Sequence, residues 1–229
     1  MHILELEIAT AALPKQRDFY TRLLGAPQTV TADRLSFQIG RSRLTFAVTP
    51  AAPSGSYHFA FNIPGNQFEE AKVWLRQHAL PMTDEAGNDE FHSAAWDAHM
   101  LYFRDPDGNI AELIACHTLR SVSDLPFSGQ SLLNISEIGI VTEDVAAQVA
   151  HLQESTGAVS YQWSGNPAFT PLGDENGLFI VVQHGRVWFP SVDVTARHLP
   201  VKVRVATGTG ARTLSFGDST GFGDSSGVW

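Results

Sequence analysis

One stretch of the sequence, YFRDPDGNIAEL at residues 102–113, carries the clearest structural signal. Its centre, DPDG at 105–108, is typical of a tight turn, because Asp is favoured at the first position, Pro at the second and Gly at the fourth. Apolar residues flank this turn in short runs of the length of strands. We therefore predict a β-hairpin whose strands lie at 99–104 and 109–115.

The same order of elements, a strand, a helix and then further strands, occurs three times along the chain. A strand with alternating apolar residues opens each unit. These opening strands are predicted at 3–9, 57–63 and 135–141. A helix with one apolar stripe follows each of them, and Gly25 and Gly157 are placed to end the first and the third helix. The sequence thus predicts three βαβββ units.

The predicted fold class is α+β, with tandem βαβββ modules that form incomplete mixed-sheet barrels. A single unit cannot bury its own sheet face, so we expect units to pair, either within one chain or between two chains. The Gly- and Ser-rich end of the sequence predicts a loosely ordered tail. The predicted segments are a domain at 1–118 built from paired units at 1–50 and 56–116, a linker at 119–132, a third unit with extra strands at 133–206, and the tail at 207–229.

Composition limits the partners of this protein. The 229 residues are 43% hydrophobic and carry a formal net charge of -9, which argues against a nucleic-acid partner. No apolar run approaches the length of a membrane-spanning helix, and the first residues do not resemble a signal peptide. Cys116 is the single cysteine, so no internal disulfide can form. We predict a cytoplasmic protein that binds neither nucleic acid nor membranes.

Three motifs are similar to those of a known superfamily. The segment FYTRLLG at 19–25 resembles its first helix, YHFAF at 57–61 resembles the strand that opens its second module, and the hairpin at 102–113 is the most specific match. Over roughly residues 1–190 the chain resembles the vicinal oxygen chelate superfamily, the fold of glyoxalases, bleomycin-resistance proteins and extradiol dioxygenases. This resemblance implies two βαβββ modules around a divalent metal, which holds adjacent oxygen atoms of a substrate.

The resemblance also implies where the metal ligands stand, namely on the first and last strands of each module. It assigns His58 and Glu112 in the second unit. In the first unit it favours Glu5 over His2, because Glu5 stands at the family's spacing before Phe19. The predicted metal ligands are therefore Glu5, His58 and Glu112. Two alternatives stay open: His2 as the ligand, or Glu5 as part of an ordinary solvated sheet face.

The third unit resembles the family less closely at the ligand positions. Glu137 stands where a histidine is frequent, and the last strand, at 178–182, contains no residue that binds metals. We therefore expect this unit to lack a metal and to serve as structure or as a subunit interface.

The expected function follows from the resemblance. We predict a glyoxalase-like isomerase or lyase that depends on a divalent metal, Zn, Ni, Mn or Fe, and acts as a homodimer on a small molecule with vicinal oxygens. One metal carboxylate, Glu5 or Glu112, would act as the general base. Extradiol ring cleavage, or a metal-free binding protein of the bleomycin-resistance kind, is the alternative. The predicted substrate-binding residues are Phe61, Trp96, His99 and Tyr102.

Overall fold

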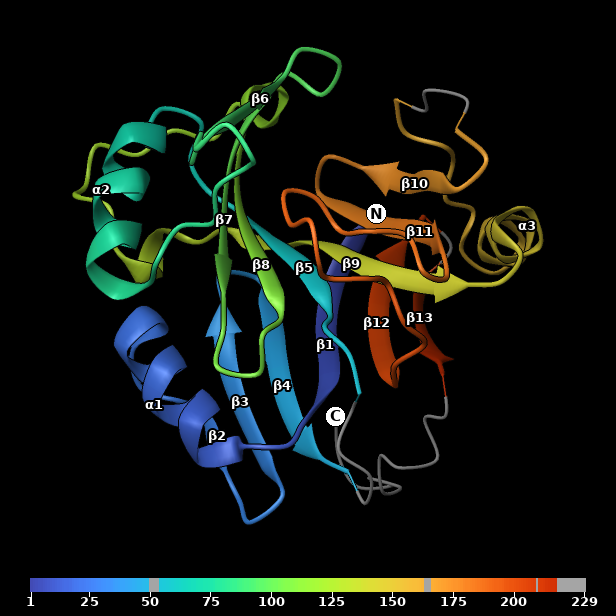
Figure 1. The fold of residues 1–229 in the computed structure, drawn as a ribbon, viewed down its shortest axis with the longest axis horizontal. Helices are drawn as coiled ribbons and strands as arrows, with labels where there is room; N and C mark the ends of the chain where they lie inside the picture. Colours follow the sequence, from blue (N-terminus) through green and yellow to red (C-terminus); the bar gives the residue numbers. More distant parts are fainter. Residues whose placement is uncertain (50–53, 163–165, 209, 218–229) are drawn as a thin grey trace.

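The computed structural model describes residues 1–49, 54–162, 166–208 and 210–217. They form a mixed sheet flanked by helices (Figure 1), so the predicted α+β class is confirmed. No helix among these residues is both long enough and apolar enough to cross a membrane. In chain order the elements are β1 (His2–Thr10), α1 (Leu13–Leu24), β2 (Thr29–Val30), β3 (Arg34–Ile39), β4 (Ser42–Val48), β5 (His58–Asn62), α2 (Phe68–His78), β6 (Phe91–Ser93), β7 (Ala98–Arg104), β8 (Ile110–Cys116), η1 (His117–Leu119), η2 (Gly129–Ser131), β9 (Asn134–Thr142), α3 (Val145–Thr156), β10 (Phe169–Asp174), β11 (Gly177–Gln183), β12 (Val201–Thr207) and β13 (Gly210–Phe216).

The strands join in the order β2-β3-β4-β1-β9-β5-β8-β7-β6, with β10 and β11 attached through β9 and with β12 and β13 attached through β1. In each of the three units the first strand pairs in parallel with the last, as β1 with β4, β5 with β8 and β9 with β11. In Figure 1, α1 and α2 lie along one side of the molecule and α3 lies at the opposite end. The predicted βαβββ order is therefore present in the first two units. The third unit has only β10 and β11 after α3 among the described residues, so its prediction is corrected to βαββ.

The units pair differently from the prediction. We expected 1–50 to pair with 56–116, but the second unit instead joins the third through the antiparallel strands β5 and β9. The corresponding edge of β1 is occupied by β12 and contacts β9 only where Ile3 lies opposite Ile135. Neighbouring units in a sequence need not share an edge, because any strand with a free edge and matching apolar face can compete for it. Here the last hairpin of the chain takes the edge of β1.

That hairpin also corrects the predicted tail. Residues 210–216 form β13, which pairs along its whole length with β12, from Val201 opposite Phe216 to Thr207 opposite Gly210. One of the glycines that suggested a loose tail, Gly210, begins β13 with a positive φ of 115°. The remainder of the predicted tail, 218–229, lies outside the described residues.

The predicted linker, 119–132, packs against both helices of the first two units. The side-chain amide of Gln130 donates to the carbonyl of Leu24 at the end of α1, at 2.6 Å. The backbone N–H of Phe127 donates to the carboxylate of Glu70 on α2, at 3.0 Å. The segment thus fixes the chain between the second and third units, which brings β9 beside β5.

The turn in the hairpin at 102–113 forms as predicted. The N–H of Gly108 donates to the carbonyl of Asp105 at 2.9 Å, and Gly108 has a positive φ of 80°. The strands on either side, β7 and β8, pair so that Tyr102 lies opposite Glu112. This register places both side chains on the same face of the sheet.

Candidate metal centre

Three ionisable side chains meet on one face of the sheet: His58 of β5, Glu112 of β8 and Glu137 of β9. The strand register explains the meeting, because Ala60 lies opposite Glu112 on one side and opposite Glu137 on the other. His58 is two residues before Ala60 and therefore points to the same face. Each of the three residues is 6% exposed or less. Strands of two units thus build one buried cluster.

The orientation of His58 leaves one ring nitrogen facing the carboxylates. Its Nδ1 lies 3.3 Å from the carbonyl oxygen of Ile110. A carbonyl oxygen can only accept a hydrogen bond, so Nδ1 is the donor in this contact. Its Nε2 lies 3.6 Å from Glu112 and 3.4 Å from Glu137. A histidine that donates through one nitrogen to a backbone carbonyl presents the other nitrogen in the form that binds metals.

The cluster concentrates negative charge in a buried place. Burial raises the pKa of Glu112 well above its ordinary value, and the neighbouring Glu137 raises this pKa further. A divalent cation would offset both carboxylate charges. One ligand atom from each residue lies within 4.8 Å of the other two. Ligands about 2.1 Å from a metal stand about 3.0–3.4 Å apart, so the donor set fits a cation after small side-chain movements.

The two units contribute unequally to this centre. His58 and Glu137 occupy equivalent places on the opening strands β5 and β9. The residue equivalent to Glu112 on the last strand of the third unit is Ile180, because it pairs with Gly139, two residues past Glu137. Ile180 is 2% exposed and cannot bind a metal. Three protein ligands would therefore leave coordination positions open for a substrate.

A pocket of about 350 Å³ opens above the cluster. All three candidate ligands line it, and most of the other walls are aromatic. This volume is near the lower end of the range for small-molecule sites, about 300–1,000 Å³. The remaining lining residues are Phe91, His92, Ser93, Trp96, Met100, Tyr102, Phe169, Ile180, Arg186, Trp188 and Phe189.

The residues predicted from the sequence for the first unit lie elsewhere. The carboxylate of Glu5 stands between Arg43, at 3.6 Å, and Arg204, at 3.7 Å. Neither Glu5 nor His2 is among the described residues that form the cluster or line the pocket. The prediction that Glu5 shares a cleft with His58 and Glu112 is therefore corrected. The physical reason is the pairing of the units, since β1 does not border β5.

The predicted substrate-binding residues divide in the same way by strand alternation. Trp96 and Tyr102 line the pocket, whereas Phe61 and His99 do not. Phe61 is fully buried on the other face of β5, against Phe59. His99 points away from Tyr102 on β7, and its Nδ1 lies 2.8 Å from Nε2 of His117. Successive side chains on a strand face opposite sides, and this rule excludes both residues.

Glu137 is the site residue that the sequence did not assign. The signal was present, because Glu137 stands at the superfamily's ligand position on its opening strand. The sequence nevertheless predicts no metal in this unit, because its last strand, 178–182, carries no residue that binds metals. The structure places Glu137 in one cluster with His58 and Glu112, so that the second unit supplies two of the three side chains and the third unit supplies one.

The arrangement of these units is the kind of fold that the sequence motifs suggested, because solved structures share it. Solved structures with this fold include a putative dioxygenase from Bacillus subtilis, at 14% identity and a TM-score of 0.55. That match covers 80% of this chain and 63% of the dioxygenase, so this chain spans less than two thirds of that protein's length. No family model and no curated protein matches the sequence.

Two further solved structures are similar over parts of the fold. Glyoxalase I from Zea mays is 14% identical with a TM-score of 0.48, over 80% of this chain and 66% of that one. A mutant of the fosfomycin resistance protein FosX from Listeria monocytogenes, complexed with Mn(II) and dihydroxypropylphosphonic acid, is 16% identical with a TM-score of 0.38. It covers 50% of this chain and 89% of FosX. At such identities the likeness concerns the fold alone.

The packing of Trp188 gives a first prediction. A Cβ atom on Gly139 would lie 2.7 Å from Cη2 of Trp188, whose ring is centred 5.0 Å from that of His58. We expect Gly139→Ala to displace the indole and to lower the free energy of unfolding by about 1–3 kcal/mol, because the added methyl group would overpack the pocket wall. Urea unfolding followed by tryptophan fluorescence measures both effects.

Gly208→Ala is the control, since a Cβ there meets no atom within 4 Å. The packing argument is wrong if the two variants unfold at the same urea concentration and have the same emission spectrum.

Proposed function

We propose that this protein is a divalent-metal-dependent lyase or isomerase that acts on a small molecule with vicinal oxygen atoms. The proposed metal ligands are His58, Glu112 and Glu137, where Glu137 takes the place that the sequence assigned to Glu5. The observation that carries the proposal is the buried trio of ligand-type side chains on three adjoining strands, which line a pocket of about 350 Å³.

The side chains present have distinct roles in this proposal. A bound divalent metal would supply Lewis acidity toward the oxygen atoms of the substrate. The Ile110 carbonyl holds the imidazole of His58, and Glu112 is the proposed general base for a proton next to a carbonyl group. Tyr102, opposite Glu112 on β7, forms part of the aromatic wall that excludes water. We propose Trp96 as a second wall residue that contacts the substrate.

The composition of the trio favours this chemistry over ring cleavage. Extradiol-type iron sites use two histidines and one carboxylate. This cluster has one histidine, His58, and two carboxylates. Two carboxylates neutralise a divalent cation. Such a site suits a hard or borderline metal, such as Mn, Ni or Zn, that acts as a Lewis acid rather than in a redox reaction.

A metal-free binding protein is the second candidate, and one observation favours it. If His58 carries a proton on both nitrogens, its Nε2–H can contact both carboxylates, at 3.6 and 3.4 Å, without a cation. The aromatic walls would then hold a ligand by themselves. The two candidates differ in whether the purified protein contains a metal.

Metal analysis of protein purified without chelators tests the proposal. We expect a stoichiometric divalent metal in the wild type, its loss in Glu112→Gln, and its retention in Glu5→Gln, which makes the same change in charge on β1. Absence of metal from a folded wild type that also takes up none on addition would sink the enzyme proposal and favour the binding protein. Oxygen uptake with catechols would support the dioxygenase instead. Sedimentation equilibrium tests the predicted homodimer separately.

A further inference from the structure

Arg186 lines the pocket, and among the described residues it has no carboxylate partner. Its Nη1 donates to the carbonyl of Val187 at 3.3 Å, and its guanidinium lies 4.9 Å from the centre of the Phe169 ring. A guanidinium has five N–H donors, so these contacts leave most of its capacity unused. Arg186 is also the one Lys or Arg among the described pocket residues.

Arg186 is half-buried without a described carboxylate partner, although the chain is acidic, with 24 Asp and Glu residues against 15 Lys and Arg. Six other arginines pair with carboxylates, whereas five described arginines that form no such pair, Arg22, Arg41, Arg120, Arg197 and Arg212, are exposed. Those that form such pairs are Arg17, Arg34, Arg43, Arg76, Arg104 and Arg204. Partial burial without a counter-charge is costly unless a ligand supplies that charge.

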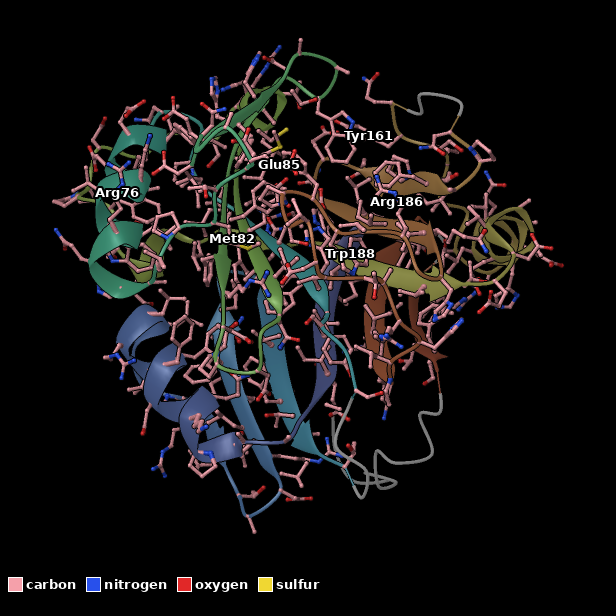
Figure 2. All side chains as sticks on the ribbon, viewed as in Figure 1. Arg76, Met82, Glu85, Tyr161, Arg186 and Trp188 are labelled. Carbon is pink, nitrogen blue, oxygen red and sulfur yellow. The ribbon has the colours of Figure 1, made fainter. Side chains whose placement is uncertain are left out.

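The backbone holds Arg186 in place. It follows β11, where its N–H donates to Gln183 and its carbonyl accepts from Ala196. Two residues further on, Trp188 donates its N–H to Val194 at 2.8 Å. Figure 2 shows Arg186 on the β10–β11 side of the molecule, with Trp188 nearer the centre. With this backbone fixed, the contacts of the guanidinium with the Val187 carbonyl and the Phe169 ring hold it before any ligand binds, which lowers the entropic cost of pairing.

The charges in the pocket add up to a preference for anions. Two carboxylates, Glu112 and Glu137, cancel a divalent metal, and Arg186 then leaves one positive charge. Burial lowers the pKa of Arg186, yet an arginine remains charged at neutral pH. The walls around it are aromatic, with Phe91, Phe169 and Phe189 among them. Such walls favour a flat, apolar body.

We propose that the substrate is an anionic aryl molecule, whose carboxylate or phosphonate group pairs with Arg186 while its vicinal oxygens reach the His58 cluster. This inference rests on the proposed function for the second contact, but the pairing with Arg186 can be measured without the metal. A planar guanidinium binds both kinds of oxyanion through two parallel hydrogen bonds.

Calorimetric titration with three probes tests the pairing. Phenylacetate and phenylphosphonate carry the two candidate anions, and phenylacetamide is the neutral match of phenylacetate. We expect both acids, or the one acid that fits, to bind more tightly than the amide to wild type, with and without metal. Arg186→Gln should weaken binding of that acid about tenfold to a hundredfold and leave the amide unchanged. Arg186→Lys should recover part of the loss.

Arg104→Gln is the matched control, because this half-exposed arginine pairs with Asp193 outside the pocket. It should bind all probes as the wild type does, and thermal unfolding shows that each variant is folded. Equal binding of acid and amide, unchanged acid binding by Arg186→Gln, or no binding of any probe would overturn the inference.

The metal-free arm separates the two proposals. If acid binding is lost when the metal is removed and is unchanged by Arg186→Gln, the anion binds the metal. That result overturns this inference and leaves the proposed function intact. Conversely, if the protein takes up no metal but binds the acid in a way that depends on Arg186, the pairing with Arg186 is supported and the proposed metal centre is contradicted.

Discussion

Glu137→Gln is expected to abolish stoichiometric metal binding, although Glu137 belongs to the unit that the sequence left without a metal. Its carboxylate lies 3.4 Å from Nε2 of His58 and is buried. Loss of residues that only support a metal ligand typically weakens affinity about 10- to 100-fold, so loss of a ligand itself should exceed that range. Competition with a coloured chelator measures the change.

The same variant should change stability in opposite directions with and without metal. At a metal concentration about 100 times the dissociation constant, binding stabilises the wild type by about 2.7 kcal/mol, and Glu137→Gln should lose this increment. Without metal, the variant should be as stable as the wild type or more stable, because it no longer places two carboxylates, Glu112 and Glu137, together in a buried site. Thermal unfolding with and without metal gives both values.

Glu143→Gln is the matched control for this experiment. Glu143 is exposed just beyond β9, where it contacts His184 and His198. A loss of metal affinity in this control equal to that in Glu137→Gln, or destabilisation of metal-free Glu137→Gln, would contradict the assignment of Glu137 as a ligand.

Asp105→Ala is expected to lower the free energy of unfolding by about 2–4 kcal/mol, because it removes a buried acceptor and leaves several donors unsatisfied. One oxygen of Asp105 accepts from the backbone N–H groups of Asp107 and Asn109. The other accepts from the side chains of Gln16 at 3.1 Å, Tyr20 at 3.3 Å and Asn109 at 2.9 Å. Asp105 therefore connects the β7–β8 turn to α1 through hydrogen bonds.

The effect of Asp105 should depend on pH. Burial is the main cause that raises its pKa from 3.8 to about 6, so the folded protein binds this proton more tightly than the unfolded chain does. The wild type gains stability from this residue as pH falls through about 6 toward 4, and the alanine variant does not. The difference between the two should therefore widen over that interval.

Urea unfolding at several pH values measures the difference. Asp193→Ala, which removes an exposed carboxylate paired with Arg104, should change stability by less than about 1 kcal/mol. An Asp105 variant as stable as this control, or a difference that narrows at low pH, would show that the turn does not depend on the network.

Asp105 also shows why the hairpin motif was informative. In the sequence Asp105 supports a turn, within the motif that most resembles the superfamily. In the structure it serves the scaffold: it joins two units and fixes the register that sets Tyr102 opposite Glu112. The motif thus predicted the fold more directly than the chemistry.

The alternation of side chains between the two faces of a strand explains which site residues the sequence could identify. It placed Glu112 on one face of the hairpin, and it could have excluded Phe61, which faces away from His58 on the same strand. The same rule separates His99 from Tyr102. Those two errors required no structure to correct, because the period of a strand is fixed by backbone geometry.

By itself, the sequence determined the first two βαβββ units, the helix and closing hairpin of the third unit, and the alternation of faces along each strand, because these depend on local backbone preferences and on periodicity. Only the tertiary structure decided which strand edges meet, because an edge pairs with whichever apolar strand fits it best in the folded chain. The last hairpin occupies the edge of β1, and β9 occupies the edge of β5. That choice leaves Glu5 among arginines and brings Glu137 beside His58 and Glu112.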